Sequence, residues 1–287
     1  MRLVVEHLTE HRYARSVELG EHRMLFRPRD SHDLRLLSTR LEISPTADIR
    51  WMHDVFGNSI ALARFGQSAD VLRVKSTIRL DHFGLAGPDF PIAPYAETWP
   101  FAYPPTEMPD LSRVIERHYH DADHRVDAWA RALLPRGGHV GTRDLLVAMT
   151  ESVKRQFGYI KRTEPGTQTP IETLRLGGGT CRDYALFMME AARALGFAAR
   201  FVSGYLHDAG TSMQGGGETH AWVQIYLPGA GWVEFDPTNG LVGGAHLIRV
   251  AVARDPSQAV PFSGTYIGRP EDLIETRVDV RVAPEAD

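Results

Sequence analysis

The chain has 287 residues, of which 43% are hydrophobic and 24% charged, so it can form one large or, more readily, two ordinary packed domains. Its formal net charge of −4 gives no reason to expect a nucleic acid or an anionic membrane surface as a partner. A single cysteine excludes an intramolecular disulfide and suits a reducing compartment. No apolar stretch typical of a signal peptide or a membrane span is present. We therefore expect a cytoplasmic protein, and the sequence does not predict its oligomeric state.

Residues 1–105 are predicted to form an N-terminal antiparallel β domain. Segments of alternating polarity, LRLLSTRLEIS, IALARFG and VLRVKSTIRLDHF, are separated by the turn-forming clusters SPTAD, DVFGN and GQSAD. Several short strands at this spacing favour a small sandwich or barrel. The domain could form one wall of a cleft, bind a partner or be a structural appendage, because a fold does not by itself give a function.

A proline-rich stretch from about residue 89 to residue 109 is predicted to be a linker, since proline fits neither a helix interior nor a central strand. The aromatic residues Trp99, Phe101 and Tyr103 lie within it, which favours packing on a domain surface. Helical patterns follow at about 110–133 and 142–157.

Two histidines in the first helical pattern, His120 and His124, are four residues apart, a spacing that a metal site can use. No cysteine and no H-E-x-x-H pattern accompanies them, and the polarity of an exposed helix explains them as well. We therefore predict no metal site and no cofactor.

The only cysteine, Cys181, lies where a glycine-rich turn meets an apolar segment. Glycines 177–179 oppose helix formation and Thr180 is a good N-cap, so a helix is predicted to begin at about Cys181. Its polar residues form one narrow stripe of Arg182, Asp183, Glu190 and Arg193, which predicts a core helix. The helix N-terminus favours a thiolate and can receive an oxyanion, although a lone cysteine is otherwise more often a small buried hydrophobe.

Residues 219–227 and 232–237 are predicted to pair as strands around the turn at 228–231. If the loop is odd in length and centred on Gly229, Trp222 lies opposite Asp236 and His220 is the diagonal neighbour of that carboxylate. A loop of even length would put His220 and Asp236 on opposite faces. In the first register Asp236 orients His220, which activates Cys181 and later protonates a leaving group. Cys181, His220 and Asp236 are therefore the candidate catalytic residues.

The runs GGTCRD, HAW and FDPTN resemble the transglutaminase-like superfamily of papain-related folds, in the bacterial branch with its own N-terminal β domain. The resemblance implies an α+β fold with a β domain at 1–105 and a catalytic domain at 106–287, in which an antiparallel sheet accompanies the buried helix of the cysteine. It implies that Cys181 is the nucleophile, His220 the general base and acid, and Asp236 the orienting residue. By analogy with family members that use an upstream side chain, Tyr159 is a candidate second oxyanion donor.

The implied reaction is acyl transfer from a carboxamide of a peptide or protein substrate through a thioester on Cys181. An amine acceptor would make the enzyme a crosslinking transferase, and water would make it an amidase or peptidase; the candidate triad does not distinguish them. A non-enzymatic binding or scaffold protein that retains the fold is a further alternative, which the presence of all three candidate residues argues against. Residues 207–218, which border His220, form a candidate gating loop.

Overall fold

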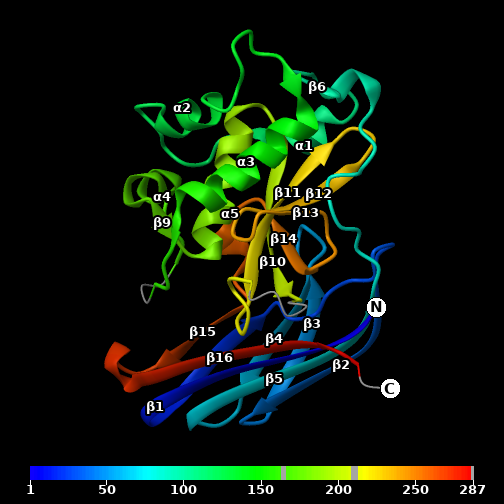
Figure 1. Ribbon diagram of the computed structural model, residues 1–287. Coiled ribbons are helices and arrows are strands. Elements are labelled where there is room, and N and C mark those ends of the chain that lie inside the picture. The colour runs from blue at the N-terminus through cyan, green and yellow to red at the C-terminus, as the bar shows by residue number, and fades with distance from the viewer. Residues whose placement is uncertain (163–165, 208–212, 286–287) are drawn as a thin grey trace.

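The first layer of the molecule is a curled antiparallel sheet of seven strands, drawn at the bottom of Figure 1. The structure is a computed structural model that describes residues 1–162, 166–207 and 213–285. The strands of this sheet are β1 (Arg2–Met24), β2 (Leu34–Ser44), β3 (Ala47–His53), β4 (Ser59–Phe65), β5 (Ala69–His82), β15 (Phe262–Ile267) and β16 (Leu273–Pro284). The predicted segments LRLLSTRLEIS, IALARFG and VLRVKSTIRLDHF correspond to β2, β4 and β5.

Strand β1 is the centre of this sheet because it is long enough to have different neighbours along its length. Its first half pairs with β5 and β16, and its second half pairs with β4 and β15. The register with β5 shifts between Arg12 and Val17, and such irregularities bend a strand and increase its twist. The N-terminal strands therefore form one curled sheet, where a sandwich or a barrel was expected.

Both ends of the chain meet in this first sheet. Strand β16 pairs with β1 from Leu3 opposite Pro284 to Tyr13 opposite Leu273, and the backbone N–H of Glu285 donates to the carbonyl of Arg2. Figure 1 shows the two termini on the same side of the molecule. The division at residue 105 stays a prediction, but the pairing places β15 and β16 with the N-terminal strands rather than with the core sheet.

The core sheet has five antiparallel strands in the order β13-β12-β11-β10-β14. Its members are β10 (Ala199–Leu206), β11 (His220–Leu227), β12 (Gly231–Asp236), β13 (Leu241–Val242) and β14 (Leu247–Ala253). The helices are α1 (Met108–Ile115), α2 (Arg125–Arg131), α3 (Thr142–Gln156), α4 (Pro170–Leu176) and α5 (Cys181–Ala194), with short 3₁₀ turns η1 (Pro94–Ala96), η2 (Pro256–Ala259) and η3 (Pro270–Asp272). Two small ladders join β6 (Thr98–Trp99) to β7 (Val140–Gly141) and β8 (Gly158–Tyr159) to β9 (Gly178–Gly179).

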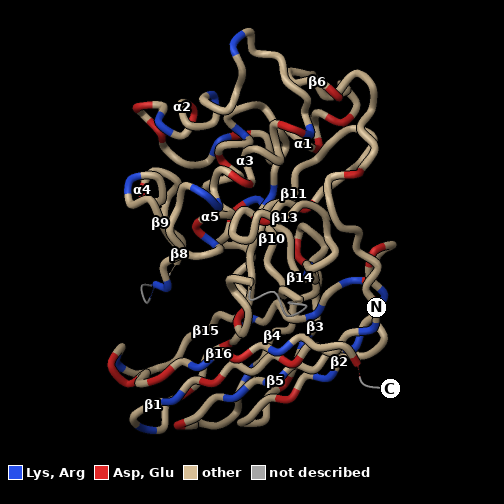
Figure 2. The backbone as a smooth tube through the Cα atoms, in the orientation of Figure 1, with Lys and Arg blue, Asp and Glu red and all other residues tan. Residues whose placement is uncertain are grey.

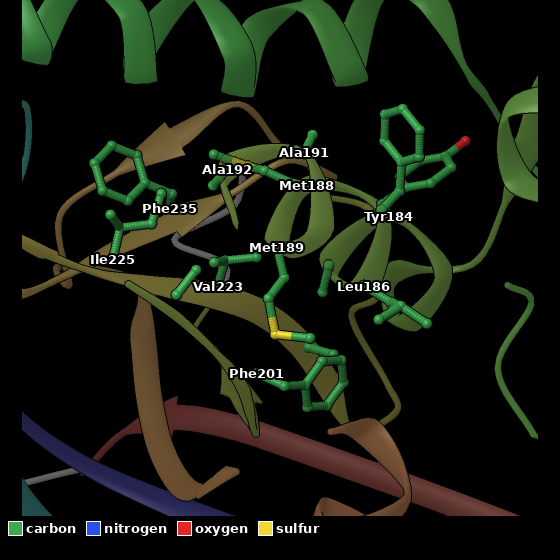
Figure 3. Close-up of a cluster of buried hydrophobic side chains, with 14 of the residues drawn as sticks. Tyr184, Leu186, Met188, Met189, Ala191, Ala192, Phe201, Val223, Ile225 and Phe235 are labelled. Atoms are coloured by element: carbon green, nitrogen blue, oxygen red, sulfur yellow. The ribbon is translucent and has the colours of Figure 1, made fainter. Parts of the chain in front are cut away.

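Helix α5 is buried on nearly every side, as its composition predicts. Apolar residues of the helix, among them Leu186 and Met189, form one cluster with Val223 and Ile225 of β11 and Phe201 of β10 (Figure 3). The polar stripe is buried as well: Glu190 pairs with Arg193 at 2.8 Å and with Arg117 at 2.9 Å. Buried charges persist only when they are paired and hydrogen-bonded, and Glu190 and Arg193 meet that condition.

The prediction of one continuous helix at 110–133 is wrong, because the structure has two helices there. Helix α1 ends at Ile115 and α2 begins at Arg125. Between them the carboxylate of Asp121 accepts hydrogen bonds from the backbone N–H groups of Arg125 and Val126, at 2.9 and 3.0 Å. The segment HYHDADH is therefore a connection that caps α2, which is why His120 and His124 do not share a helix face. Within the described residues no group of three metal-ligating side chains is found.

The proline-rich linker packs on the core, as expected from its aromatic residues. The Trp99 indole donates to the carbonyl of Leu195 at 2.9 Å, and the Tyr103 hydroxyl donates to the carbonyl of Tyr226 at 2.9 Å. Among the described residues no helix is long and apolar enough to cross a membrane.

An apolar interface holds the two sheets together. Leu3, Val5 and Leu80 of the first sheet are buried against Tyr205 and Ile248 of the core sheet. Burying such a side chain contributes about 1.5–3 kcal/mol. Outside this interface the first sheet carries acidic and basic residues next to one another along its strands, which Figure 2 shows in red and blue.

Candidate active site

Glycines determine how the chain approaches Cys181. Gly177 ends α4 with a positive φ of 62°, a conformation that glycine adopts without steric cost. Strand β9 then runs parallel to β8, and a Cβ atom on Gly178 would lie 2.5 Å from the carbonyl oxygen of Gly158. A Cβ atom on Gly179 would lie 2.8 Å from the Asp183 side chain. The close approach of these backbones requires the glycine-rich run that precedes the cysteine.

Cys181 is the first residue of α5, at the position predicted from Thr180 and the glycines. The carboxylate of Asp183 accepts hydrogen bonds from the backbone N–H and hydroxyl of Thr180, at 2.8 and 3.0 Å. It also accepts the backbone N–H of Gln168 at 2.7 Å and pairs with Arg162 at 2.9 Å. The polar stripe predicted Asp183 on the helix surface but not this role, although T-x-x-D is a recognisable capping pattern.

The predicted odd-length hairpin is confirmed. Val223 lies opposite Phe235 and Leu227 opposite Gly231, so the loop is centred on Gly229. Nε2 of His220 and Oδ2 of Asp236 are 2.8 Å apart, and the two side chains are fully buried. This places the imidazole and the carboxylate in direct hydrogen-bonding contact.

His220 is held between Asp236 and Cys181. Burial by itself lowers the pKa of His220, but the charge and hydrogen bond of Asp236 and the interaction with the Cys181 side chain raise it to about 10. Because Nε2 is taken by Asp236, and Nδ1 is buried without another hydrogen-bond partner among the described residues, Nδ1 is the nitrogen available to the thiol. The structure thus brings together the three side chains that the sequence analysis singled out. Cys181 itself keeps 6% of its surface exposed.

The carboxylate of Asp236 is fixed by its own set of donors. Burial would raise the pKa of Asp236, but the His220 charge and several hydrogen bonds hold it below its usual value. The Asn239 side chain donates to Oδ2 at 2.9 Å, and the backbone N–H of Thr238 donates to Oδ1 at 2.9 Å. Asn239 was quoted within the FDPTN run but was not assigned a role, and its place three residues after the carboxylate is the signal that points to it.

Tyr159 lies close to the cysteine because β8 pairs with β9. Tyr159 is opposite Gly179 in this ladder, two residues before Cys181. Burial and the charge of nearby Cys181 raise the pKa of Tyr159, so the phenol stays protonated at neutral pH and can donate a hydrogen bond.

The part of the candidate gating loop that the structure describes, residues 213–218, approaches the histidine. A Cβ atom on Gly215, whose φ is +89°, would lie 2.6 Å from Nδ1 of His220. The loop is tied to the site by Asn239, which accepts the backbone N–H of Gln214 at 2.9 Å. It is also tied to the first sheet, because the backbone N–H of Val280 donates to Gly217 at 2.9 Å. Residues 208–212 of the predicted loop lie outside the described part of the chain.

Two family models match parts of the chain. Residues 128–237 match the family described as the transglutaminase-like superfamily, and residues 3–81 match the bacterial transglutaminase-like N-terminal region. The chain belongs to the transglutaminase-like superfamily. This is a family of cysteine-dependent enzymes, and the predicted fold class is confirmed.

Relatives occur in mycobacteria. The chain is 31% identical to the Mycobacterium leprae protein ML0607 over 141 residues, which are 48% of the chain and 50% of that relative. It thus spans only about half the length of ML0607. It is 26% identical over 292 residues to the Mycobacterium tuberculosis protein Rv2569c, covering 97% of the chain and 92% of that relative.

The fold also occurs in a solved structure. A crystal structure of a candidate cysteine protease from Cytophaga hutchinsonii superimposes with a TM-score of 0.73, covering 100% of the chain and 92% of that protein. The sequence identity is 16%, so the likeness shows a shared fold.

Proposed function

We propose that this member of the superfamily catalyses acyl transfer from a carboxamide through a thioester on Cys181, with His220 and Asp236 completing a catalytic triad. The observation that carries the proposal is the fully buried His220–Asp236 pair at 2.8 Å, whose second imidazole nitrogen remains available to a thiol at a helix N-terminus. A positioned base, an orienting carboxylate and a nucleophile are the parts that covalent catalysis needs.

In the first step the Cys181 sulfur attacks the carbonyl carbon of the amide and forms a C–S bond. The carbonyl oxygen gains the electron pair, and backbone N–H groups at the start of α5 stabilise that oxyanion. The Tyr159 hydroxyl is the proposed second donor, because it is protonated and lies close to Cys181. The imidazolium of His220 then gives its proton to the departing ammonia or amine, and the C–N bond breaks to leave the thioester.

In the second step an amine or water attacks the thioester, with neutral His220 accepting its proton and the Cys181 sulfur leaving. We propose a peptide or protein as the acyl donor, and the transferase and the peptidase or amidase differ only in this second nucleophile. We place the reaction in the cytoplasm, where a reducing environment keeps a lone thiol free. A non-enzymatic scaffold would need none of the buried charge pairing around His220, which is costly to build without a chemical use.

The test is to trap the acyl-enzyme. The protein is incubated with a mixed library of glutamine-containing peptides, quenched in acid and measured by intact mass, with Cys181→Ala as the control. We expect one adduct whose mass equals that of the donor minus ammonia or amine and which is absent from Cys181→Ala. No adduct from any donor, or the same adduct on Cys181→Ala, would exclude the proposed thioester.

The same reaction separates the two acceptors. With methylamine added, a transferase incorporates the amine into the donor peptide at the expense of hydrolysis. An amidase or peptidase releases the carboxylic acid at a rate that methylamine does not change.

A further inference from the structure

A cavity of about 670 Å³ lies between the two sheets, and neither Cys181 nor His220 lines it. Its walls come from several parts of the chain: residues 29–33 after β1, residues 56–58 before β4, residues 83–90 after β5, single positions of β10 and β11, residues 230–234 at β12, residues 243–244 after β13, and β14. Pockets that hold small molecules have volumes of about 300–1,000 Å³, so this cavity is large enough for one.

Part of the charge that lines the cavity is paired. Glu234 accepts hydrogen bonds from Trp222, Gln224 and Arg249, and Arg249 also pairs with Asp33 at 3.2 Å. Within the described residues, the other two arginines of the lining, Arg29 and Arg200, have no carboxylate at ion-pair distance, and Arg29 donates to the carbonyl of Gly57. The Nε of Arg200 donates to the Gln224 side chain at 2.7 Å, and its guanidinium carbon lies 4.0 Å from the centre of the Trp232 ring.

Arg200 is therefore held in place with donor groups left over. The stacking on Trp232 and the bond to Gln224 fix the plane of the guanidinium, which is the arrangement used to bind a carboxylate with two parallel hydrogen bonds. Burial lowers the pKa of Arg200 to about 9, and the negative charge of Glu234 offsets part of this effect. The guanidinium therefore still carries its charge at neutral pH.

The rest of the lining limits which anion fits. Three arginines and four carboxylates line the cavity, so a ligand with one negative charge meets less repulsion there than a polyanion such as phosphate. The aromatic side chains of Phe56, Phe83, Phe90 and Trp232 supply an apolar wall. A single negative charge with an apolar body is the chemistry that these walls complement.

We propose that this cavity is a second binding site for a monocarboxylate with an apolar body. The carboxylate of that ligand pairs with Arg200. Part of the wall of this cavity lies on the same hairpin as His220. In the β11–β12 pairing, Gln224 lies opposite Glu234, Glu234 accepts the indole N–H of Trp222, and the Trp222 ring stacks on His220 with centroids 6.0 Å apart.

The test uses 3-phenylpropionate and 3-phenylpropionamide, which share the apolar body and differ in charge. Binding is measured by titration calorimetry and tryptophan fluorescence on the Cys181→Ala protein, so that no thioester chemistry contributes. We expect 3-phenylpropionate to bind with one site per chain, and the amide and inorganic phosphate to bind at least 10-fold more weakly. Equal binding of acid and amide, or no saturable binding of the acid, would overturn the proposal.

Two variants locate the site. Arg200→Gln is expected to weaken 3-phenylpropionate binding at least 10-fold, whereas Arg64→Gln, which removes an exposed arginine of β4, leaves it unchanged. Binding to Arg200→Gln at the wild-type affinity would contradict the assignment. The comparison of acid with amide on the Cys181→Ala protein decides the question even if Arg200→Gln does not fold.

Discussion

His220 is buried against the Asp236 carboxylate and interacts with the Cys181 side chain. Asp236 accepts Nε2–H at 2.8 Å and favours the charged imidazolium, which burial alone would disfavour. The raised pKa of about 10 means that the ring is protonated at neutral pH and can neutralise a thiolate next to it. A proton on His220 and a negative charge on sulfur are the starting state that the proposed first step requires.

Replacement of Asp236 by Asn tests the negative charge of the carboxylate, because the two side chains have nearly the same size and shape. The variant keeps a hydrogen-bonding group but removes the charge, so burial should lower the pKa of His220 from about 10 towards or below 6.5. We expect kcat/KM for a peptide amide to fall by roughly 10³-fold or more, and the alkaline limb of its pH profile to move down by several pH units. An unchanged pH profile would show that Asp236 does not control the imidazole.

The residue types of the site could be predicted from the sequence because each lies at a position with its own local signal. Cys181 follows a glycine-rich turn and an N-cap, and the odd-length turn centred on Gly229 brings His220 towards Asp236. Arg200 could not be predicted in the same way. Its importance depends on Trp232, Gln224 and the other walls of the cavity, and these are brought together only when distant segments of the chain pack.

At the scale of elements, helix α5 depends on how its first turn is anchored. Asp183 is fully buried and joins Arg162, the backbone of Gln168 and the N-cap Thr180 in one hydrogen-bonded group. This group holds the strand β9 and the helix start together, and so it fixes the direction from which Cys181 faces His220.

Asp183→Ala should therefore destabilise the protein strongly. The change removes one partner of a buried pair and leaves donors without an acceptor, which costs about 3–5 kcal/mol. The matched control is Asp144→Ala, which removes an acidic residue from the first turn of α3 and should cost about 1 kcal/mol or less. Urea denaturation followed by circular dichroism measures both, and equal losses in the two variants would contradict this role of Asp183.

Element prediction succeeded where local pattern decides and failed where side chains or distant segments decide. Strand β2 follows directly from its alternating polarity and from the turn cluster SPTAD that ends it. The break between α1 and α2 does not, because it depends on the side chain of Asp121 capping the second helix. The pairing of β16 with β1 joins residues at opposite ends of the chain, and no local pattern encodes it.

At the scale of the whole molecule, buried histidines make the first sheet and its interface sensitive to acid. His7 is buried between the Tyr205 hydroxyl at 3.0 Å and the Thr9 hydroxyl at 3.1 Å, and burial lowers the pKa of His7 to about 4. Burial likewise lowers the pKa of His11 to about 4, helped by the nearby His22. The folded state therefore favours the neutral imidazole at both positions.

Stability should fall as the pH falls from about 6.5 to about 4. A lowered pKa in the folded state gives stability that is present above the unfolded value of about 6.5 and lost in acid. His220 has a raised pKa and acts in the opposite direction, losing its contribution as pH rises towards about 10, so it does not cause the acid loss. Urea midpoints at pH 7.5, 6, 5 and 4 measure the effect.

The control for this prediction is His7→Gln, which keeps a polar side chain but cannot titrate. It should show a smaller decrease in stability between pH 6.5 and pH 4 than the wild-type protein, by on the order of 3 kcal/mol. The same pH dependence in both proteins would show that His7 is not the source.

The measurement that tests the central claim most directly is the rate of Cys181 alkylation by iodoacetamide as a function of pH, in the wild-type protein and in His220→Ala. We expect fast alkylation at pH 6 in the wild type, because a protonated His220 next to the sulfur favours the reactive thiolate. In His220→Ala, checked for folding by circular dichroism, the rate at pH 6 should fall at least about 10-fold. Equal rates in the two proteins across the pH range would contradict an activated cysteine at this site.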